Sequence, residues 1–149
     1  MAVKSDSRSQ WDSALVERLA ERGFRFTPQR ERVYNILLET RDHPTAEQVF
    51  LRAKTSMPEI SMATVYNCLD ALVQCRLIRQ VHLKAGATRY CPNMADHGHF
   101  CCDQCGGVFD VDWNGKPWSM EPALPKGSRV LHYEIGVHGL CPACASRKP

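Results

Sequence analysis

Two pairs of cysteines constrain the fold of this chain more than any other feature of its sequence. Cys102 and Cys105 form one C-x-x-C pair, and Cys141 and Cys144 form a second pair near the C-terminus. Four thiolates are the ligand set of a closed tetrahedral zinc site, and the two-residue spacer lets both sulfurs of a pair turn onto one ion. The spacing therefore predicts a structural zinc site that joins two distant stretches of the C-terminal half.

The cysteine content also bears on the compartment. The chain has 8 cysteines among 149 residues, no apolar leader at its start and no long apolar run. These features predict a soluble protein of the reducing cytoplasm, where C-x-x-C pairs bind metals or act as redox dithiols and do not form a disulfide framework. A dithiol switch is thus the alternative to zinc. Gly106 and Gly107, which follow the first pair, favour zinc.

The two halves of the chain differ in composition, which predicts two small domains. The net charge is only +3, but residues 1–90 hold 14 of the 19 Lys and Arg residues. A basic first half permits a nucleic-acid partner without requiring one. We place the domains at residues 1–90 and 91–149, with the boundary inside the stretch 89–96.

Helical periodicity dominates the first domain. One helix is expected from Trp11 to Arg22, and a second begins at Thr27-Pro28, because proline at the first helical position loses no hydrogen bond. A third helix follows Thr45, which forms a capping box with Gln48. A fourth helix follows the cap residue Ser61.

Period-two alternation replaces the helical pattern after residue 76. A turn at residues 84–87 separates this stretch from residues 88–90, so the pattern predicts a β-hairpin. Helices followed by a basic hairpin form a winged helix-turn-helix, in which the last helix enters the major groove of DNA and the hairpin contacts the backbone. Small polar side chains, Ser61, Thr64 and Asn67, lie at the N-terminal end of the fourth helix. The alternative from pattern alone is a small helical domain with an antiparallel flap.

The second domain has the pattern of strands. Residues 108–112 form one strand candidate, and residues 129–138 alternate between an apolar and a polar face up to the second cysteine pair. Residues 114–128 are rich in proline and glycine, so at most a short helical turn is expected there. This pattern predicts a small antiparallel sheet that zinc holds together, and an α+β class for the whole chain.

Other motifs accompany the paired cysteines. They are His43-Pro44-Thr45-Ala46 before the third helix, Thr64-Val65-Tyr66 at the head of the fourth, and His97-x-His99 before the first cysteine pair. From about Gly23 to Cys144, this combination resembles the ferric uptake regulator (Fur) family. The resemblance implies a homodimeric, metal-dependent transcriptional repressor with an N-terminal winged-helix domain and a C-terminal α/β dimerisation domain. A metal at the hinge would close the two DNA-binding domains onto an operator.

The resemblance also implies metal ligands. The family's structural zinc site is matched by Cys102, Cys105, Cys141 and Cys144, and its regulatory site by His43, Cys91, His97, His99 and Asp110. Cys91 departs from the pattern, because iron sensors carry Asp or Glu there and zinc sensors tend to carry cysteine. A thiolate favours Zn²⁺, whereas His43 is typical of iron and peroxide sensors, so zinc is preferred and iron or manganese stays open. Cys101 is the second candidate for the thiolate.

Contacts with operator DNA follow from the same resemblance. Tyr66 and Asn67 match a pair that contacts bases and backbone, and Arg25 matches a basic residue that reaches the minor groove. The full set of candidates is Arg25, Ser61, Thr64, Tyr66, Asn67, Arg79, Lys84 and Arg89, of which the last three, together with Arg30, are expected to contact phosphates. Ordinary solvated charge is the alternative for each arginine.

These inferences predict a repressor that binds operator DNA as a homodimer when metal fills the hinge site. A peroxide-responsive redox sensor of the same family is the alternative, and loss of DNA binding on peroxide treatment would distinguish it. A zinc-dependent enzyme is a third reading, but the sequence contains no H-E-x-x-H helix and no recognisable nucleophile–base pair. We therefore expect no enzymatic activity, no small-molecule substrate and no membrane partner.

Overall fold

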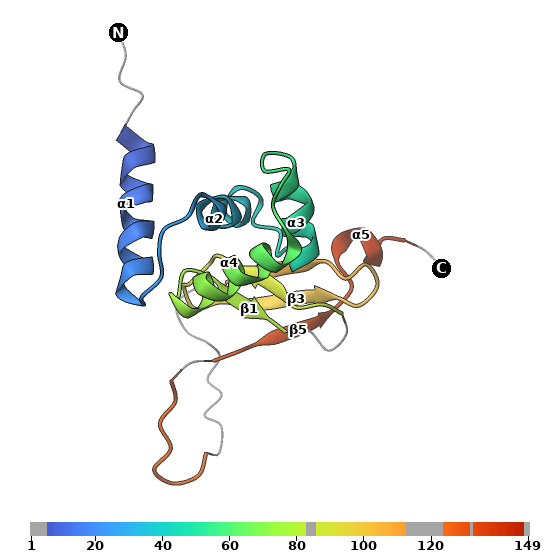
Figure 1. The fold of residues 1–149 in the computed structure, drawn as a ribbon. Helices are drawn as coiled ribbons and strands as arrows, with labels where there is room; N and C mark the ends of the chain where they lie inside the picture. Colours follow the sequence, from blue (N-terminus) through green and yellow to red (C-terminus); the bar gives the residue numbers. More distant parts are fainter. Residues whose placement is uncertain (1–5, 83–85, 113–123, 132, 148–149) are drawn as a thin grey trace. The chain divides into compact units, whose positions relative to one another are not determined.

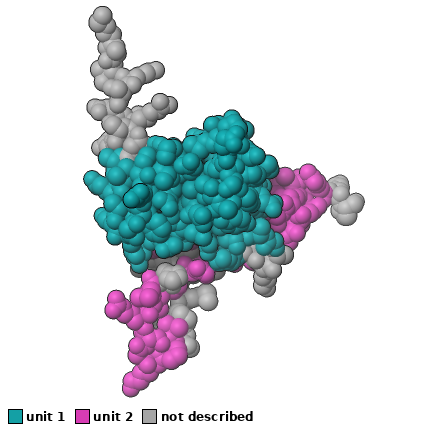
Figure 2. Space-filling view, viewed as in Figure 1, with its two compact units in different colours: residues 1–94 teal, residues 95–149 magenta. Residues whose placement is uncertain are grey.

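A computed structural model of the protein describes residues 6–82, 86–112, 124–131 and 133–147, with the backbone alone described in 6–12. The chain folds into two compact units, Met1–Met94 and Ala95–Pro149 (Figure 2). The division lies beyond residue 90 because the last strand of the first unit continues to Cys91, which is still paired with Arg79. No helix among the described residues is long and apolar enough to cross a membrane.

The described part of the first unit contains four helices, three of which start at a capping residue. They are α1 (Asp6–Glu21), α2 (Pro28–Thr40), α3 (Ala46–Lys54) and α4 (Met62–Gln74) (Figure 1). The side chains of Thr27, Thr45 and Ser61 each accept a hydrogen bond from a backbone N–H of the first turn that follows. Helix α1 starts at Asp6, ahead of the predicted residue 11.

The core of the first unit is built from the apolar stripes of these helices. Its most buried members are Leu19, Val33, Ile36, Leu37, Val49, Ala53, Val65, Leu69 and Leu72, none of them more than 1% exposed. Burying a side chain of this size contributes about 1.5–3 kcal/mol. The predicted helical stripes therefore form one core.

A two-stranded wing follows α4. Strand β1 (Arg79–Val81) pairs antiparallel with β2 (Arg89–Cys91), with Gln80 opposite Tyr90. Helices α3 and α4 form the helix-turn-helix pair that precedes this wing. The first unit is thus the winged helix that the sequence predicts.

The described residues of the second unit form a three-stranded sheet and a short helix. Strand β3 (Gly98–Cys102) lies between β4 (Val108–Val111) and β5 (Gly136–Gly139), and α5 (Pro142–Ala145) ends the described fold. Strand β4 runs antiparallel to β3, whereas β5 runs parallel to it. The α+β class is confirmed.

The prediction for the last strand is wrong in two respects. Strand β5 is shorter than the predicted stretch 129–138, and the sheet is mixed, not antiparallel. Strand β4 ends at Val111 opposite Gly98, and β5 begins at Gly136 opposite His99, so the chain enters β5 at the end of the sheet where it left β4. Before β5, Leu131 is 79% exposed, because the described part of this unit offers its alternating apolar face no cover.

Candidate metal centres and nucleic-acid interface

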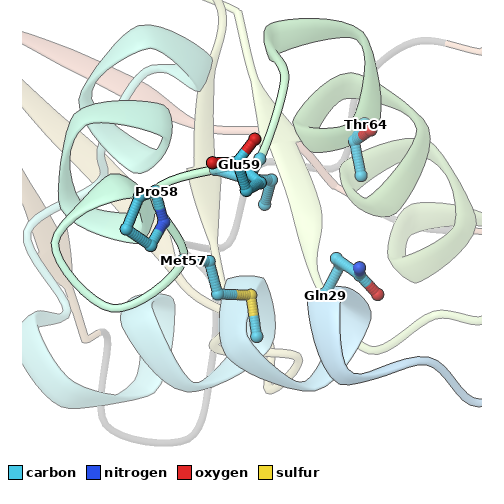
Figure 3. A pocket seen from close by; sticks show the side chains of 6 residues that line it. Gln29, Met57, Pro58, Glu59 and Thr64 are labelled. Carbon is cyan, nitrogen blue, oxygen red and sulfur yellow. The ribbon is translucent and has the colours of Figure 1, made fainter.

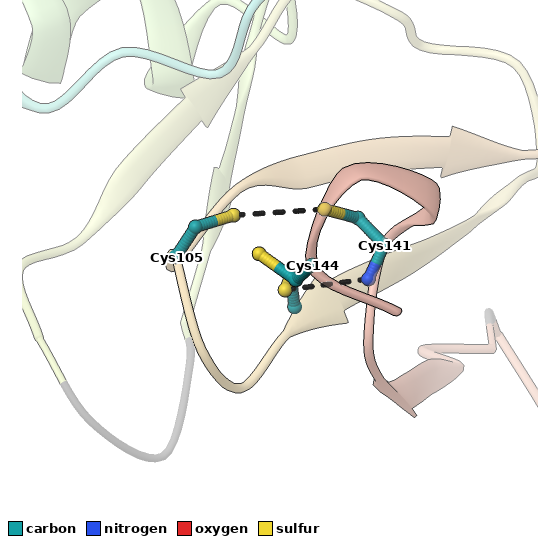
Figure 4. A group of neighbouring side chains, drawn as sticks. Cys105, Cys141 and Cys144 are labelled. Atoms are coloured by element: carbon teal, nitrogen blue, oxygen red, sulfur yellow. Dashed lines mark hydrogen bonds between the residues drawn. The ribbon is translucent and has the colours of Figure 1, made fainter. Parts of the chain in front are cut away.

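Four cysteines converge at one end of the sheet in the second unit (Figure 4). Cys102 ends β3 and Cys105 lies in the turn after it, while Cys141 and Cys144 flank the first turn of α5. All four sulfurs lie within 4.8 Å of one another. The parallel direction of β5 produces this arrangement, because it brings the chain to the end of β3 at which Cys102 lies.

The spacing of these sulfurs fits a tetrahedral metal ion. The Sγ atoms of Cys105 and Cys141 are 3.8 Å apart. Zinc–sulfur bonds of about 2.3 Å in a tetrahedron require sulfurs about 3.8 Å apart. Three of the four cysteines are buried, and Phe100 packs against them. A site with four protein ligands and no open position is structural in type.

Backbone geometry shapes the first cysteine pair. Gly106 has φ +73°, a left-handed conformation that glycine adopts at little cost, and its N–H donates to the carbonyl of Cys102. The N–H of Gly107 donates to Sγ of Cys105 at 3.4 Å. Both glycines therefore serve the turn that points the two sulfurs inward.

The thiols of this cluster differ strongly in acidity. Backbone N–H groups of Cys105 and Cys141 lower the pKa of Cys102 to about 6, and the bond from Cys141 measures 3.3 Å. Burial, together with the neighbouring thiols, raises the pKa of Cys144 to about 12. The cluster thus favours one thiolate and opposes more, which is the charge conflict that a bound divalent cation relieves.

A second group of ligands lies at the opposite end of β3. His99 pairs with Asp110 on β4, and His97 precedes β3 by one residue. The two Nε2 atoms are 3.0 Å apart, and Oδ1 of Asp110 lies 3.2 Å from Nε2 of His97 and 3.4 Å from Nε2 of His99. Three ligand atoms therefore form a nearly equilateral triangle within the second unit.

This triangle fits a divalent ion. An ion held by these three atoms would need metal–ligand bonds of about 2.0–2.2 Å, which ligand atoms 3.0–3.4 Å apart allow. Nδ1 of His97 is 2.7 Å from the carbonyl oxygen of Ala95. Because a carbonyl only accepts, Nδ1 carries the proton and the neutral ring offers its lone pair at Nε2. Ala95 thus orients the ring of His97 through its backbone carbonyl, a role that its side chain gives no means to predict.

His43 and Cys91 are neighbours in the first unit. Thr45 forms an antiparallel bridge with Arg89, and the N–H of Tyr90 donates to the carbonyl of Pro44 at 3.0 Å. Continuing that register places His43 opposite Cys91, and their ligand atoms lie within 4.8 Å of each other. Both are buried, at 3% and 1% exposure. The resemblance pointed to both residues, but the strand pairing that joins them is a structural finding.

Cys101 occupies a different environment from Cys91. It is buried on β3, where it pairs with Val108 on one side and His138 on the other. Its sulfur is not among the ligand atoms that converge within 4.8 Å in the described part of the chain. Cys101 shares a strand face with His99, whereas Cys91 lies beside His43 in the first unit.

Most of the predicted DNA contacts lie on the surface of the first unit. Arg25, Ser61, Tyr66 and Asn67 are exposed, and Thr64, Arg79 and Arg89 are partly exposed, whereas Lys84 lies outside the described residues. Ser61 accepts the N–H of Thr64 at 3.1 Å as the cap of α4. Arg89 donates one guanidinium N–H to the carbonyl of His43 at 3.0 Å, so part of its side chain is engaged within the unit.

A cavity of about 310 Å³ lies beside the start of α4 (Figure 3). It is lined by Gln29, Met57, Pro58, Glu59, Ile60 and Thr64. Glu59 is the single ionisable group among these residues, so the lining offers no metal-ligand set.

The sequence profile of the ferric uptake regulator family matches residues 21–136, most of the chain. The chain belongs to the ferric uptake regulator family. It is 29% identical over 134 residues to the peroxide operon regulator of Bacillus subtilis, covering 89% of this chain and 92% of that protein. It is 26% identical over 156 residues to the peroxide-responsive repressor PerR of Staphylococcus aureus, covering 99% and 100%.

Solved structures of Fur-family proteins share this fold. The ferric uptake regulator of Helicobacter pylori superposes with a TM-score of 0.74 at 16% identity, over 99% of this chain and all of that one. The Campylobacter jejuni peroxide stress regulator gives 0.68 at 26% identity, over 94% and 100%. The family and its named members are transcriptional regulators, so this Fur-family chain is a regulator and not an enzyme.

Proposed function

We propose that this Fur-family chain is a metal-dependent transcriptional repressor that binds operator DNA as a homodimer and responds to peroxide. The observation that carries the proposal is a winged helix followed, in the same chain, by the converging atoms of His97, His99 and Asp110. A DNA-binding fold joined to a preformed set of metal ligands is the arrangement expected of a regulator controlled by metal. Because operator DNA lies with the chromosome, we place this activity in the cytoplasm.

Residues 1–90 are proposed as the DNA-binding domain. Helix α4 carries the exposed Tyr66 and Asn67 near its N-terminal end, the end that recognition helices present to base edges. The proposed contacts are Arg25, Ser61, Thr64, Tyr66, Asn67, Arg79, Lys84 and Arg89. Arg79, Lys84 and Arg89 would pair with phosphates, so operator affinity should fall as salt rises.

Residues 91–149 are proposed as the dimerisation domain. Leu131 is 79% and Tyr133 48% exposed, and both belong to the alternating apolar face that precedes β5. Exposed apolar residues in series mark a surface that another molecule covers. A second copy of this chain is the proposed occupant. The four-cysteine site of this domain is proposed to hold Zn²⁺, as the sulfur spacing and the all-thiolate donor set favour.

The regulatory ion is proposed to take ligands from both units. His43 would come from the DNA-binding domain, Cys91 from the boundary between the domains, and His97, His99 and Asp110 from the dimerisation domain. When bound, the ion supplies a positive centre that these lone pairs share. If it binds the DNA-competent arrangement of the dimer more tightly than others, it shifts the population toward DNA binding.

Two observations favour different signals. Two histidines with one carboxylate, as in His97, His99 and Asp110, are typical of Fe²⁺ sites that react with oxygen species. The relatives named above are peroxide regulators, which supports the same reading. Cys91 is a soft ligand that favours Zn²⁺, so a zinc-responsive repressor is the second candidate.

One experiment separates these candidates. Protein purified without oxygen is analysed for metal, and its operator binding is titrated with Zn²⁺, Fe²⁺ and Mn²⁺ before and after hydrogen peroxide. For a peroxide sensor, peroxide abolishes binding by the Fe²⁺ form, and mass spectrometry finds an added oxygen on His43 or His97 or disulfides at the cysteine pairs. A response to Zn²⁺ at far lower free concentration than Fe²⁺, without peroxide sensitivity, would establish the zinc reading instead.

A further inference from the structure

The turn between α2 and α3 holds His43 in an unfavourable backbone conformation. Arg41, the residue that ends α2, has φ +48°, and His43 has φ +54°. Residues other than glycine pay about 1–2 kcal/mol for a left-handed conformation. Two such residues within three positions persist only where the surroundings hold the backbone in place.

Asp42, between these two residues, is held by Arg52 of α3. Nη1 of Arg52 is 2.9 Å from Oδ1 of Asp42, and Nη2 is 2.6 Å from Oδ2. This is a two-bond pairing of guanidinium with carboxylate, which fixes direction as well as distance. Thr40 completes the arrangement, because its hydroxyl lies 2.8 Å from Oδ1 of Asp42 and accepts from Nη1 of Arg52 at 3.1 Å.

The other side of His43 is held by the wing. Arg89 donates to the carbonyl of His43, and the N–H of Tyr90 donates to the carbonyl of Pro44, each at 3.0 Å. The peptide after His43 is thus fixed by β2, and the residue before it by Arg52. The imidazole between these two anchors is 3% exposed, and one of its nitrogens lies within 4.8 Å of the sulfur of Cys91.

We infer that Asp42 and Arg52 are positioning residues for the regulatory metal site, which set the backbone from which His43 presents its imidazole. The inference rests on the proposed function, in which His43 is a ligand. The pair fixes the backbone directly before His43, the residue of this turn that belongs to the proposed ligand set. Partners that orient a ligand typically change metal affinity by about 10- to 100-fold when they are replaced.

The test measures Zn²⁺ affinity in full-length protein whose four-cysteine site is already loaded, by competition with a chromophoric chelator. Zn²⁺ is the probe because nitrogen and sulfur sites bind it more tightly than Fe²⁺ or Mn²⁺, whatever metal acts in the cell. Asp42→Asn keeps the shape of the side chain, and Arg52→Lys keeps its charge but loses the two-bond geometry. Each is expected to weaken Zn²⁺ binding by about tenfold.

Glu39→Gln is the matched control, because the carboxylate of Glu39 forms a 3.2 Å ion pair with Arg32 within α2, separate from the pair of Asp42 and Arg52. It should leave Zn²⁺ affinity unchanged. Thermal unfolding of each variant identifies any that does not fold, and Arg52→Lys serves as the second variant if Asp42→Asn does not.

A double-mutant cycle shows whether the effect passes through His43. In a His43→Ala background, Asp42→Asn should cause no further loss of Zn²⁺ affinity. A further tenfold loss there, or wild-type affinity in both Asp42→Asn and Arg52→Lys, overturns the inference while His43 remains a ligand. Wild-type affinity in His43→Ala itself overturns both the inference and the assignment of His43 in the proposed function.

Discussion

At the scale of single residues, the acidity of the clustered thiols is the most specific consequence of the fold. We predict that chelator-stripped protein forms a thiolate with a midpoint near pH 6, measured by ultraviolet absorbance, and that Cys102→Ser removes this step. Because the folded pKa of Cys102 lies below the ordinary 9.0, the stability it contributes is complete above pH 9 and is lost as the pH falls through about 6. A first midpoint near 9 would mean that the metal-free thiols titrate as in an unfolded chain.

Two adjacent cysteines offer a matched comparison for the role of zinc. Cys102 points into the sulfur cluster, whereas Cys101, on the other face of β3, does not. We predict that Cys102→Ser loses one bound zinc ion per chain and lowers the thermal stability of the second unit, since a structural site contributes folding energy directly. Cys101→Ser should keep that zinc ion. Metal analysis and circular dichroism check both, and equal zinc content in the two variants would contradict the assignment.

At the scale of elements, Ser61 combines two roles that substitution can separate. Its side chain caps α4, and the same residue is proposed to face DNA. Ser61→Ala should lower the free energy of unfolding by about 1 kcal/mol, because one N–H of the first turn loses its acceptor. Ser61→Asp keeps the cap but adds a negative charge, so it should unfold like the wild type and bind operator more weakly. Denaturant unfolding and operator titration measure the two effects, and unchanged operator affinity in Ser61→Asp would remove Ser61 from the interface.

Elements with local causes could be predicted from the sequence, and elements with distant partners could not. Thr45 and Ser61 cap helices that begin at the next residue, so the sequence around them predicts those helices. The spacing of Cys102 and Cys105 likewise predicts a metal-binding turn. The direction of β5 depends on which end of β3 receives the chain after a long connection, which no local pattern encodes. The pairing of Asp42 with Arg52 likewise joins two separate elements, and the sequence does not show which acidic residue pairs with which basic one.

At the scale of the whole molecule, the exposed apolar face before β5 predicts self-association. Leu131 and Leu51 are both exposed leucines, at 79% and 65%, but they lie in different units. Leu131→Glu places a charge in the proposed dimer surface and should shift the protein toward monomer in light scattering at micromolar concentration. Leu51→Glu, on α3, should remain as dimeric as the wild type. A dimer undisturbed by Leu131→Glu would place the contact elsewhere.

The coupling between metal and DNA is reciprocal, and that reciprocity gives the sharpest test at this scale. If metal raises operator affinity by some factor, operator DNA must raise metal affinity by the same factor. His97→Ala removes one of the three converging ligand atoms and should bring both factors close to one, while the four-cysteine site keeps its zinc. His138→Ala is the control, because His138 lies on the same sheet and pairs with Asp103, outside the triangle. Operator titrations with and without metal, and metal titrations with and without operator, give the two factors independently. If His97→Ala retained both factors at wild-type size, the triangle of His97, His99 and Asp110 would not be the switch.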